Sequence, residues 1–331
     1  MTAAPPYVAP VPSAGDGPWT PPPPPPRSPA ARGAWTAVGL AVAVGAIGVW
    51  VPLFVINQFS TSHAPLPPTR QVITTDVSAV TVNVASGSVT VERGSGSGAV
   101  VTSSGYRGQR TPTNHVRVSG HTLTVRSSCA SGLRLGWCTR NYVLEVPART
   151  AVTAHLGTGA VEVSGVDGPL DLQSDDGSIT VTGTTGSVHA SSGTGRVTVE
   201  HVDGAVDAAS QDGEVQVAEA SGTVRATSGT GSVTLSGLTG PSVDAHSNDG
   251  RVTVGFAQGA SPPNQVTATS GTGAVTVSVP PSGTYRVVAV SATGSASNEV
   301  RSDPTSPHTI RASSTDGDVT VQYAPGWVTA G

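Results

Sequence analysis

The 331-residue chain is poor in charged and aromatic side chains and contains no lysine. Charged residues make up 11% of it, against about 25% in a typical soluble domain. The net charge of −4 gives no basic footprint, which excludes nucleic acid as a partner. Glycine (41 residues) and proline (27 residues) are abundant instead, and they favour turn-rich β structure or disorder over a helical domain.

Aromatic residues are only 4% of the chain, and residues 143–255 contain no Phe, Tyr or Trp. A sugar-processing groove generally needs such rings as platforms for its substrate. The eight histidines are scattered, and no Ser/His/Asp or Cys/His set follows from their spacing. We therefore predict no catalytic residues, no cofactor and no enzymatic activity. A carbohydrate-active β-helix enzyme is the weakest of the alternatives considered.

Long apolar runs are absent with one exception, residues 34–56, which read AWTAVGLAVAVGAIGVWVPLFVI. No charged residue occurs between Arg32 and Arg70. At 1.5 Å per residue a helix of this run would reach about 34 Å, which is enough to cross a hydrocarbon core of about 30 Å. The run is also long for a cleaved signal peptide. We predict one transmembrane helix at residues 34–56, through which the protein contacts the lipid bilayer.

The segments on either side of this run are rich in proline. Residues 1–33 cannot bury a core and are predicted to form a disordered tail, and residues 57–70 are predicted to form a linker. Arg27 and Arg32 precede the predicted span, and only Arg70 follows it closely. The positive-inside rule then predicts a cytoplasmic N-terminus and an extracytoplasmic C-terminal domain in the cell membrane.

Residues 151–331 repeat one short sequence motif. The last glycine of each GTG or xDG triplet recurs at steps of 18, 18, 18, 18, 19, 23, 21 and 23 residues: Gly159, Gly177, Gly195, Gly213, Gly231, Gly250, Gly273, Gly294 and Gly317. A nearly fixed period of this size is typical of a solenoid. We predict an all-β fold, a single-stranded β-solenoid with rungs of about 18 residues. The alternative is an antiparallel β-sandwich, because short hairpins can share the same alternation.

Two pairs of apolar residues flank each glycine with a period of two, which indicates two short strands with one buried face. The pairs after the glycine are Val161/Val163, Ile179/Val181, Val197/Val199, Val215/Val217, Val233/Leu235, Val252/Val254, Val275/Val277 and Val319/Val321. The pairs before it are Val152/Ala154, Leu170/Leu172, Val188/Ala190, Val206/Ala208, Val224/Ala226, Val243/Ala245, Val266/Ala268, Val287/Ala289 and Ile310/Ala312. We predict that both sets point into the core. The rung around Gly294 breaks the pattern.

The residue before each glycine alternates between threonine and aspartate: Thr158, Asp176, Thr194, Asp212, Thr230, Asp249, Thr272, Thr293 and Asp316. In stacked rungs this order keeps two aspartates from facing each other at about 4.8 Å, and a threonine hydroxyl could donate to a neighbouring carboxylate. Calcium at the Asp-Gly turns is an alternative, but no GGxGxD string occurs. We therefore predict no metal site.

Residues 71–150 are less regular and are predicted to start and cap the coil, with Tyr106, Trp137 and Tyr142 as bulky capping residues. Tyr323 and Trp327 are predicted to do the same at the other end.

The chain has only two cysteines, Cys129 and Cys138, and on the predicted topology they face an oxidising space. We predict that they form a disulfide. Without a nearby histidine they do not make a zinc site.

From Tyr142, the stretch YVLEVPARTAVTAHLGTGAVEVSGVDGPLDLQSDDGSITV and the rungs after it resemble the bacterial "putative adhesin" family of β-strand-repeat proteins, also called Toastrack domains. The similarity covers roughly Val80 to Tyr323. It implies a β-helix-like fold at the cell envelope, sometimes linked to membrane-stress systems, and it supplies no catalytic residues.

From these observations we predict a membrane-anchored, extracytoplasmic adhesion, scaffold or interaction module that binds an envelope protein or another cell-surface partner. The alternative is an envelope-stress signalling component whose Pro-rich tail contacts a cytoplasmic partner.

Overall fold

The computed structural model describes residues 64–107, 112–129 and 138–324. All described residues lie in one compact unit, Ser62–Gly331. Every regular element in this part is a β-strand, and it contains no helix able to cross a membrane. The predicted tail at 1–33 and the predicted span at 34–56 lie outside the described residues.

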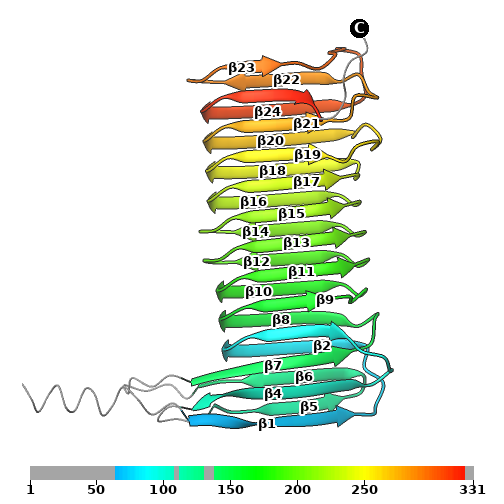
Figure 1. Ribbon diagram of the computed structural model, residues 1–331, viewed down its shortest axis with the longest axis vertical. Helices are drawn as coiled ribbons and strands as arrows, with labels where there is room; N and C mark the ends of the chain where they lie inside the picture. The colour runs from blue at the N-terminus through cyan, green and yellow to red at the C-terminus, as the bar shows by residue number, and fades with distance from the viewer. Residues whose placement is uncertain (1–63, 108–111, 130–137, 325–331) are drawn as a thin grey trace, which may run out of the picture. The chain divides into compact units, whose positions relative to one another are not determined.

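The strands form two sheets, stacked one strand above the next (Figure 1). Sheet A has 13 strands in the order β1 (Ala64–Ile73), β4 (Ala99–Arg107), β7 (Cys138–Val146), β3 (Val89–Arg93), β9 (Val161–Ser164), β11 (Ile179–Thr184), β13 (Val197–Val202), β15 (Val215–Ala220), β17 (Val233–Leu238), β19 (Val252–Phe256), β21 (Val275–Val279), β25 (Val319–Tyr323) and β23 (Ala296–Asn298).

Sheet B has 12 strands. Their order, from the opposite end, is β22 (Arg286–Ser291), β24 (Thr309–Asp316), β20 (Gln265–Thr272), β18 (Ser242–Asp249), β16 (Val224–Thr230), β14 (Val206–Ser210), β12 (Val188–Ser192), β10 (Leu170–Asp176), β8 (Ala151–Thr158), β2 (Ala79–Ser86), β6 (Thr122–Ser127) and β5 (His115–Ser119).

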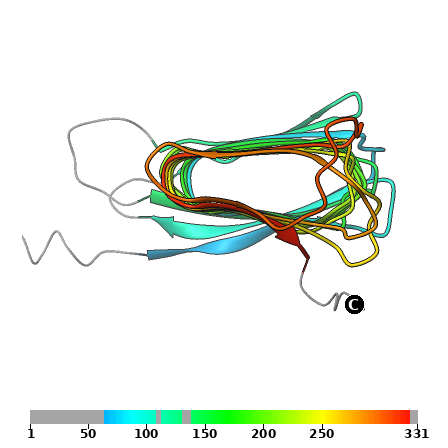
Figure 2. The ribbon, with the colours of Figure 1, turned by 90° about the horizontal axis from the view of Figure 1, so that it is seen from above.

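Each turn of the coil places one strand in each sheet, and the chain winds as a flattened ring (Figure 2). Successive rungs pair in parallel and in register, so that Val197 lies beside Val215 and Val206 beside Val224. Among the strands that the structure describes, only the pairs β1–β4, β4–β7 and β5–β6, at one end of the coil, are antiparallel. The solenoid predicted from the 18-residue period is therefore confirmed, and the antiparallel sandwich is excluded for the repeat.

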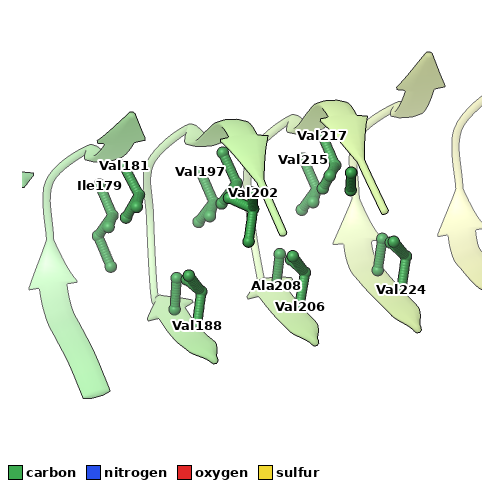
Figure 3. Packing of buried hydrophobic residues seen from close by; sticks show 14 of the residues in the cluster. Ile179, Val181, Val188, Val197, Val202, Val206, Ala208, Val215, Val217 and Val224 are labelled. Carbon is green, nitrogen blue, oxygen red and sulfur yellow. The ribbon is translucent and has the colours of Figure 1, made fainter. Parts of the chain in front are cut away.

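The core is a narrow stripe of Val, Ala and Leu side chains between the two sheets. The predicted inward pairs are buried in every rung except that of Val287 and Ala289, which are half-buried. Figure 3 shows this packing over several successive rungs, where Val197 of β13 and Val206 of β14 point into the space between the two sheets. Short aliphatic side chains fill so thin an interior, which explains why the repeat contains so few aromatic rings.

Most repeats also bury a serine, which the sequence analysis did not predict. Ser174, for example, is 3% exposed, and its hydroxyl donates to the carbonyl oxygen of Gly159 one rung away, at 3.0 Å. The same bond recurs at 2.7–2.8 Å from Ser192, Ser210, Ser228, Ser247, Ser270, Ser291 and Ser314. Since an unpaired buried carbonyl is costly, this ladder stabilises the tight turn beside it.

The glycine of each turn is fixed by close backbone contact. A Cβ built on Gly177 would overlap the carbonyl oxygen of Gly159 in the rung below it. Gly159 itself has φ +134°, a conformation that side-chain-bearing residues rarely adopt. The repeat of glycine is thus a packing requirement of the stacked turns.

Rung order in space differs from chain order at both ends. Near the start, the rung of β2 and β3 lies between that of β6 and β7 and that of β8 and β9. Near the end, the rung of β24 and β25 lies between that of β20 and β21 and that of β22 and β23. The last rung in sequence has a complete apolar pattern, and it occupies the interior. The irregular rung around Gly294 forms the end of the coil, where only one face needs a partner.

The start of the coil extends into the segment predicted as a linker. Residues 64–70 belong to β1, which forms an edge of sheet A and pairs antiparallel with β4. The register shifts between Leu66 and Thr69, at Pro67 and Pro68. Proline is tolerated here because an edge strand has one side without ladder hydrogen bonds.

Candidate interaction surfaces

The alternating turn residues form one column along the edge of the coil. Thr194 donates to Asp176 at 2.8 Å, as the sequence analysis predicted for a threonine hydroxyl beside an aspartate. The same bond joins Thr230 to Asp212, Thr272 to Asp249 and Thr293 to Asp316, at 2.6–2.9 Å. In chain order Thr272 and Thr293 follow each other, but Asp316 is paired with Thr272 in space. The inserted rung therefore restores a strict alternation of threonine and aspartate.

A second column, along the outer face of sheet B, alternates acidic side chains with histidine or arginine. It runs through register-paired positions Asp171, His189, Asp207, Arg225 and Asp244. His189 lies 3.3 Å from Asp207, and Arg225 lies 2.9 Å from Asp244. Residues 18 or 19 positions apart thus become neighbours, and no two acidic side chains of this column face each other.

Neither column concentrates carboxylates. Asp176 and Asp212 are two rungs apart with Thr194 between them. Across residues 64–107, 112–129 and 138–324, no group of three His, Cys, Asp or Glu side chains is placed to hold a metal ion. A shallow hollow of about 340 Å³ beside Gly229 contains Asp212, Asp249 and His246, but His246 is held by Thr269 at 2.7 Å and Asn248 at 3.0 Å.

One position that recurs every 18 residues, at the ends of the sheet A strands, carries unusual backbone conformations. Gly165, Gly183 and Gly237 have φ between +63° and +67° at this position, and His201 and Glu219 occupy it in two consecutive rungs with φ of +56° and +55°. Their side chains are in contact, with Nε2 of His201 3.0 Å from the Glu219 carboxylate. Non-glycine residues are uncommon in this region, and the sequence analysis did not single them out.

A polar cluster is buried at the N-terminal end of the coil, where the sequence analysis predicted a cap. Tyr142 is 1% exposed and donates to Asn114 at 3.0 Å, and burial raises the pKa of its hydroxyl. Arg140 is 6% exposed and donates to Ser103 at 2.9 Å. Tyr106 is 53% exposed and so does not cap the core, and Trp137 lies outside the described residues.

The disulfide predicted from the sequence joins Cys129 to Cys138. It ties the segment after β6 to the first residue of β7, next to the polar cluster around Arg140.

The opposite end of the coil is capped by a residue that the sequence analysis missed. Tyr285 is fully buried, donates to the carbonyl oxygen of Pro280 at 2.6 Å, and packs edge-on against His308. Burial raises the pKa of its hydroxyl well above the ordinary value. Tyr323 is partly buried in the penultimate rung, and Trp327 lies outside the described residues.

The outermost rung at this end leaves an open sheet edge. β22 is the edge strand of sheet B, and its outward residues Val288 and Val290 are 48% and 52% exposed. An unpaired edge with apolar side chains is a template for strand addition.

These features define a class of protein, a parallel β-solenoid with regular outer faces. The comparisons with known proteins give the family: the Toastrack DUF4097 family matches residues 77–322, and the chain belongs to it. No curated protein matches the chain.

Similar solved structures include a "putative adhesin" from Bacteroides fragilis NCTC 9343, with 12% identity and a TM-score of 0.37, covering 78% of this chain and 97% of that one. They also include a "putative cell adhesion protein" from Clostridium sporogenes ATCC 15579, with 9% identity and a TM-score of 0.26, covering 78% of this chain and 100% of that one.

Proposed function

We propose that this protein is a single-pass, membrane-anchored module that displays its coil outside the bacterial cell membrane and makes non-enzymatic adhesive contacts there. Residues 34–56 form the anchor, and the Pro-rich residues 1–33 lie on the cytoplasmic side. The hydropathy and flanking arginines of this segment support the anchor and its orientation. Family membership and the regular outer faces of the coil support a binding role.

The observation that carries the proposal is the difference between the two ends of the coil. β1 is the first strand after the predicted anchor in the sequence, and it is the edge strand at one end of the coil. It contains Pro65, Pro67 and Pro68. The other end finishes in β22, which contains no proline and exposes Val288 and Val290. Prolines protect an edge against pairing, whereas a free valine-rich edge accepts a strand. This difference supports a contact surface at the β22 end of the coil.

Protease treatment of intact protoplasts tests the topology. We expect removal of the coil and protection of residues 1–33. An untouched coil, under conditions that digest other surface proteins, would contradict the orientation.

Adhesion is tested with beads coated with residues 62–331 and cells that make or lack the protein. The double variant Val288→Asp/Val290→Asp should lower bead binding at least about tenfold, because it charges the open edge. The control Thr234→Asp/Thr276→Asp places the same charges on the outer face of sheet A. Equal binding by both variants, or no binding of the unaltered coil to either cell, would rule out an adhesive tip.

A further inference from the structure

Charge is divided unevenly along the coil. Residues 64–150 contain nine arginines against three acidic residues, whereas residues 151–324 contain six arginines against 17 acidic residues. The net charge of the chain is therefore small because a basic part, residues 64–150, offsets an acidic part, residues 151–324.

The arginines of the basic part gather on the outermost strands. Arg70 lies on β1, Arg107 on β4, Arg117 on β5 and Arg126 on β6. These are the last two strands of each sheet at this end (Figure 1). All four side chains are exposed, and within the described residues none makes an ion pair. By contrast, Arg93, on an interior strand, lies 3.6 Å from Asp167.

Two of these arginines line a hollow on the outer face of sheet B. His115, Arg117, Thr124 and Arg126 surround a volume of about 260 Å³. His115 is register-paired with Arg126, and Arg117 with Thr124. Two guanidinium groups, a hydroxyl and an imidazole are the donors that an anionic phosphate ester prefers.

Apolar side chains are exposed beside the arginines. Val72 on β1 is 62% exposed, Tyr106 on β4 is 53% exposed, and Val118 on β5 is 37% exposed. Val143 on β7 is 39% exposed. Of the six large apolar side chains found exposed in the described residues, these four lie at this end, and the other two lie on β22. Exposed valine and tyrosine next to arginine suit the polar–apolar boundary of a bilayer.

The connection to the rest of the chain limits how far this end can be from a membrane. Only residues 57–63 separate the predicted span from β1. Fully extended, seven residues cover about 24 Å. This step depends on the proposed anchor, whereas the charge and the exposed residues do not.

We propose that the end of the coil formed by β1, β4, β5 and β6 is a membrane-docking surface that binds the anionic phospholipid headgroups of the bilayer carrying the anchor. The arginines bind headgroup phosphates, with one phosphate in the hollow between Arg117 and Arg126, and Val72 and Tyr106 enter the headgroup region. Docking holds the coil upright, which directs β22 away from the membrane.

The test uses residues 62–331, which form one compact unit with a continuous core, and vesicles sedimented with the protein. We expect binding to vesicles containing 30% phosphatidylglycerol and none to pure phosphatidylcholine, with a steep loss as salt rises. The double variant Arg117→Gln/Arg126→Gln should bind about 10- to 30-fold more weakly, since each surface arginine contributes roughly 1 kcal/mol.

The matched control is Arg251→Gln/Arg311→Gln, which removes two exposed arginines without ion pairs from the acidic part. It should bind like the unaltered coil, and the melting temperatures of both variants should match. Equal loss in both variants, equal binding to neutral vesicles, or binding only to a soluble phosphate polymer would overturn the proposal. A separate alkaline extraction of the full chain from membranes tests the anchor, so a failed anchor and a failed docking surface give different results.

Discussion

At the scale of single residues, the stacking of the coil depends on side chains that contact the backbone of the neighbouring rung. At these positions a single added or missing atom disturbs the contact. Gly177 has no room for a Cβ beside the Gly159 carbonyl, and Ser174 provides the hydroxyl that this carbonyl requires. The inward valines, such as Val233, are fully buried, and their outward neighbours, such as Thr234, are only half-buried. Each residue type therefore repeats because its environment repeats.

The inward and outward positions of β17 should respond differently to the same charge. Val233→Asp would bury an unpaired carboxylate and should lower the free energy of unfolding by about 3 kcal/mol or more. Thr234→Asp should lower it by about 0.5 kcal/mol or less. Urea denaturation of residues 62–331 measures both values, and equal losses would contradict the assignment of the two faces.

The recurring position with positive φ offers a test of backbone strain. Gly183 has φ +67° and open space around a Cβ, so Gly183→Ala should cost about 1 kcal/mol through the backbone alone. Glu219→Gly should be neutral or stabilising, because relief of its +55° φ offsets the greater freedom of glycine in the unfolded chain. The exposed contact with His201 contributes little. Thermal melts would show this, and a costless Gly183→Ala would contradict it.

At the scale of elements, neighbouring strands contact each other through columns of outward side chains. Successive members of a column lie about one strand spacing apart. The Thr–Asp column and the Asp–His–Asp–Arg–Asp column both avoid like neighbours, although their members are 18 or more residues apart in sequence. An individual strand of five or six residues would gain nothing from this order. Only the parallel, in-register stack turns it into hydrogen bonds and ion pairs.

Removing the alternation should destabilise the stack electrostatically. Thr194→Asp/Thr230→Asp would place carboxylates on both sides of Asp212 and remove the Thr230 hydroxyl bond to it. Facing like charges cost up to about 1 kcal/mol each in a sheet, and salt weakens this repulsion. We expect a lower melting temperature at low salt and partial recovery at high salt. Thr194→Asn/Thr230→Asn is the control, and a deficit independent of salt in the Asp variant would argue against stacking at this spacing.

At the scale of the whole coil, stability should follow position in the stack and not position in the sequence. The rung of β24 and β25 is last in the chain but has neighbours on both sides, whereas the rung of β22 and β23 has one neighbour. Their burial differs accordingly, since Ile310 and Val321 are fully buried and Val288 is 48% exposed.

Hydrogen exchange can verify this order directly. Amides of β22 and β23 should exchange fastest among the C-terminal rungs, and amides of β24 and β25 should be protected like those of β20 and β21. Protection that declines steadily along the sequence towards Tyr323 would contradict the inserted rung.

The sequence alone predicted the solenoid, with a sandwich as the alternative, and also the inward Val and Ala pairs, the disulfide and the Thr–Asp contacts, because each rung repeats the same local environment and a period of 18 makes the pattern visible. The predicted span at 34–56 and its topology stay predictions. The order of the end rungs, the cap formed by Tyr285 and the basic end were decided only by the tertiary structure. At the ends a strand has a partner on one side only, so its neighbour is chosen by long-range packing that no local pattern encodes.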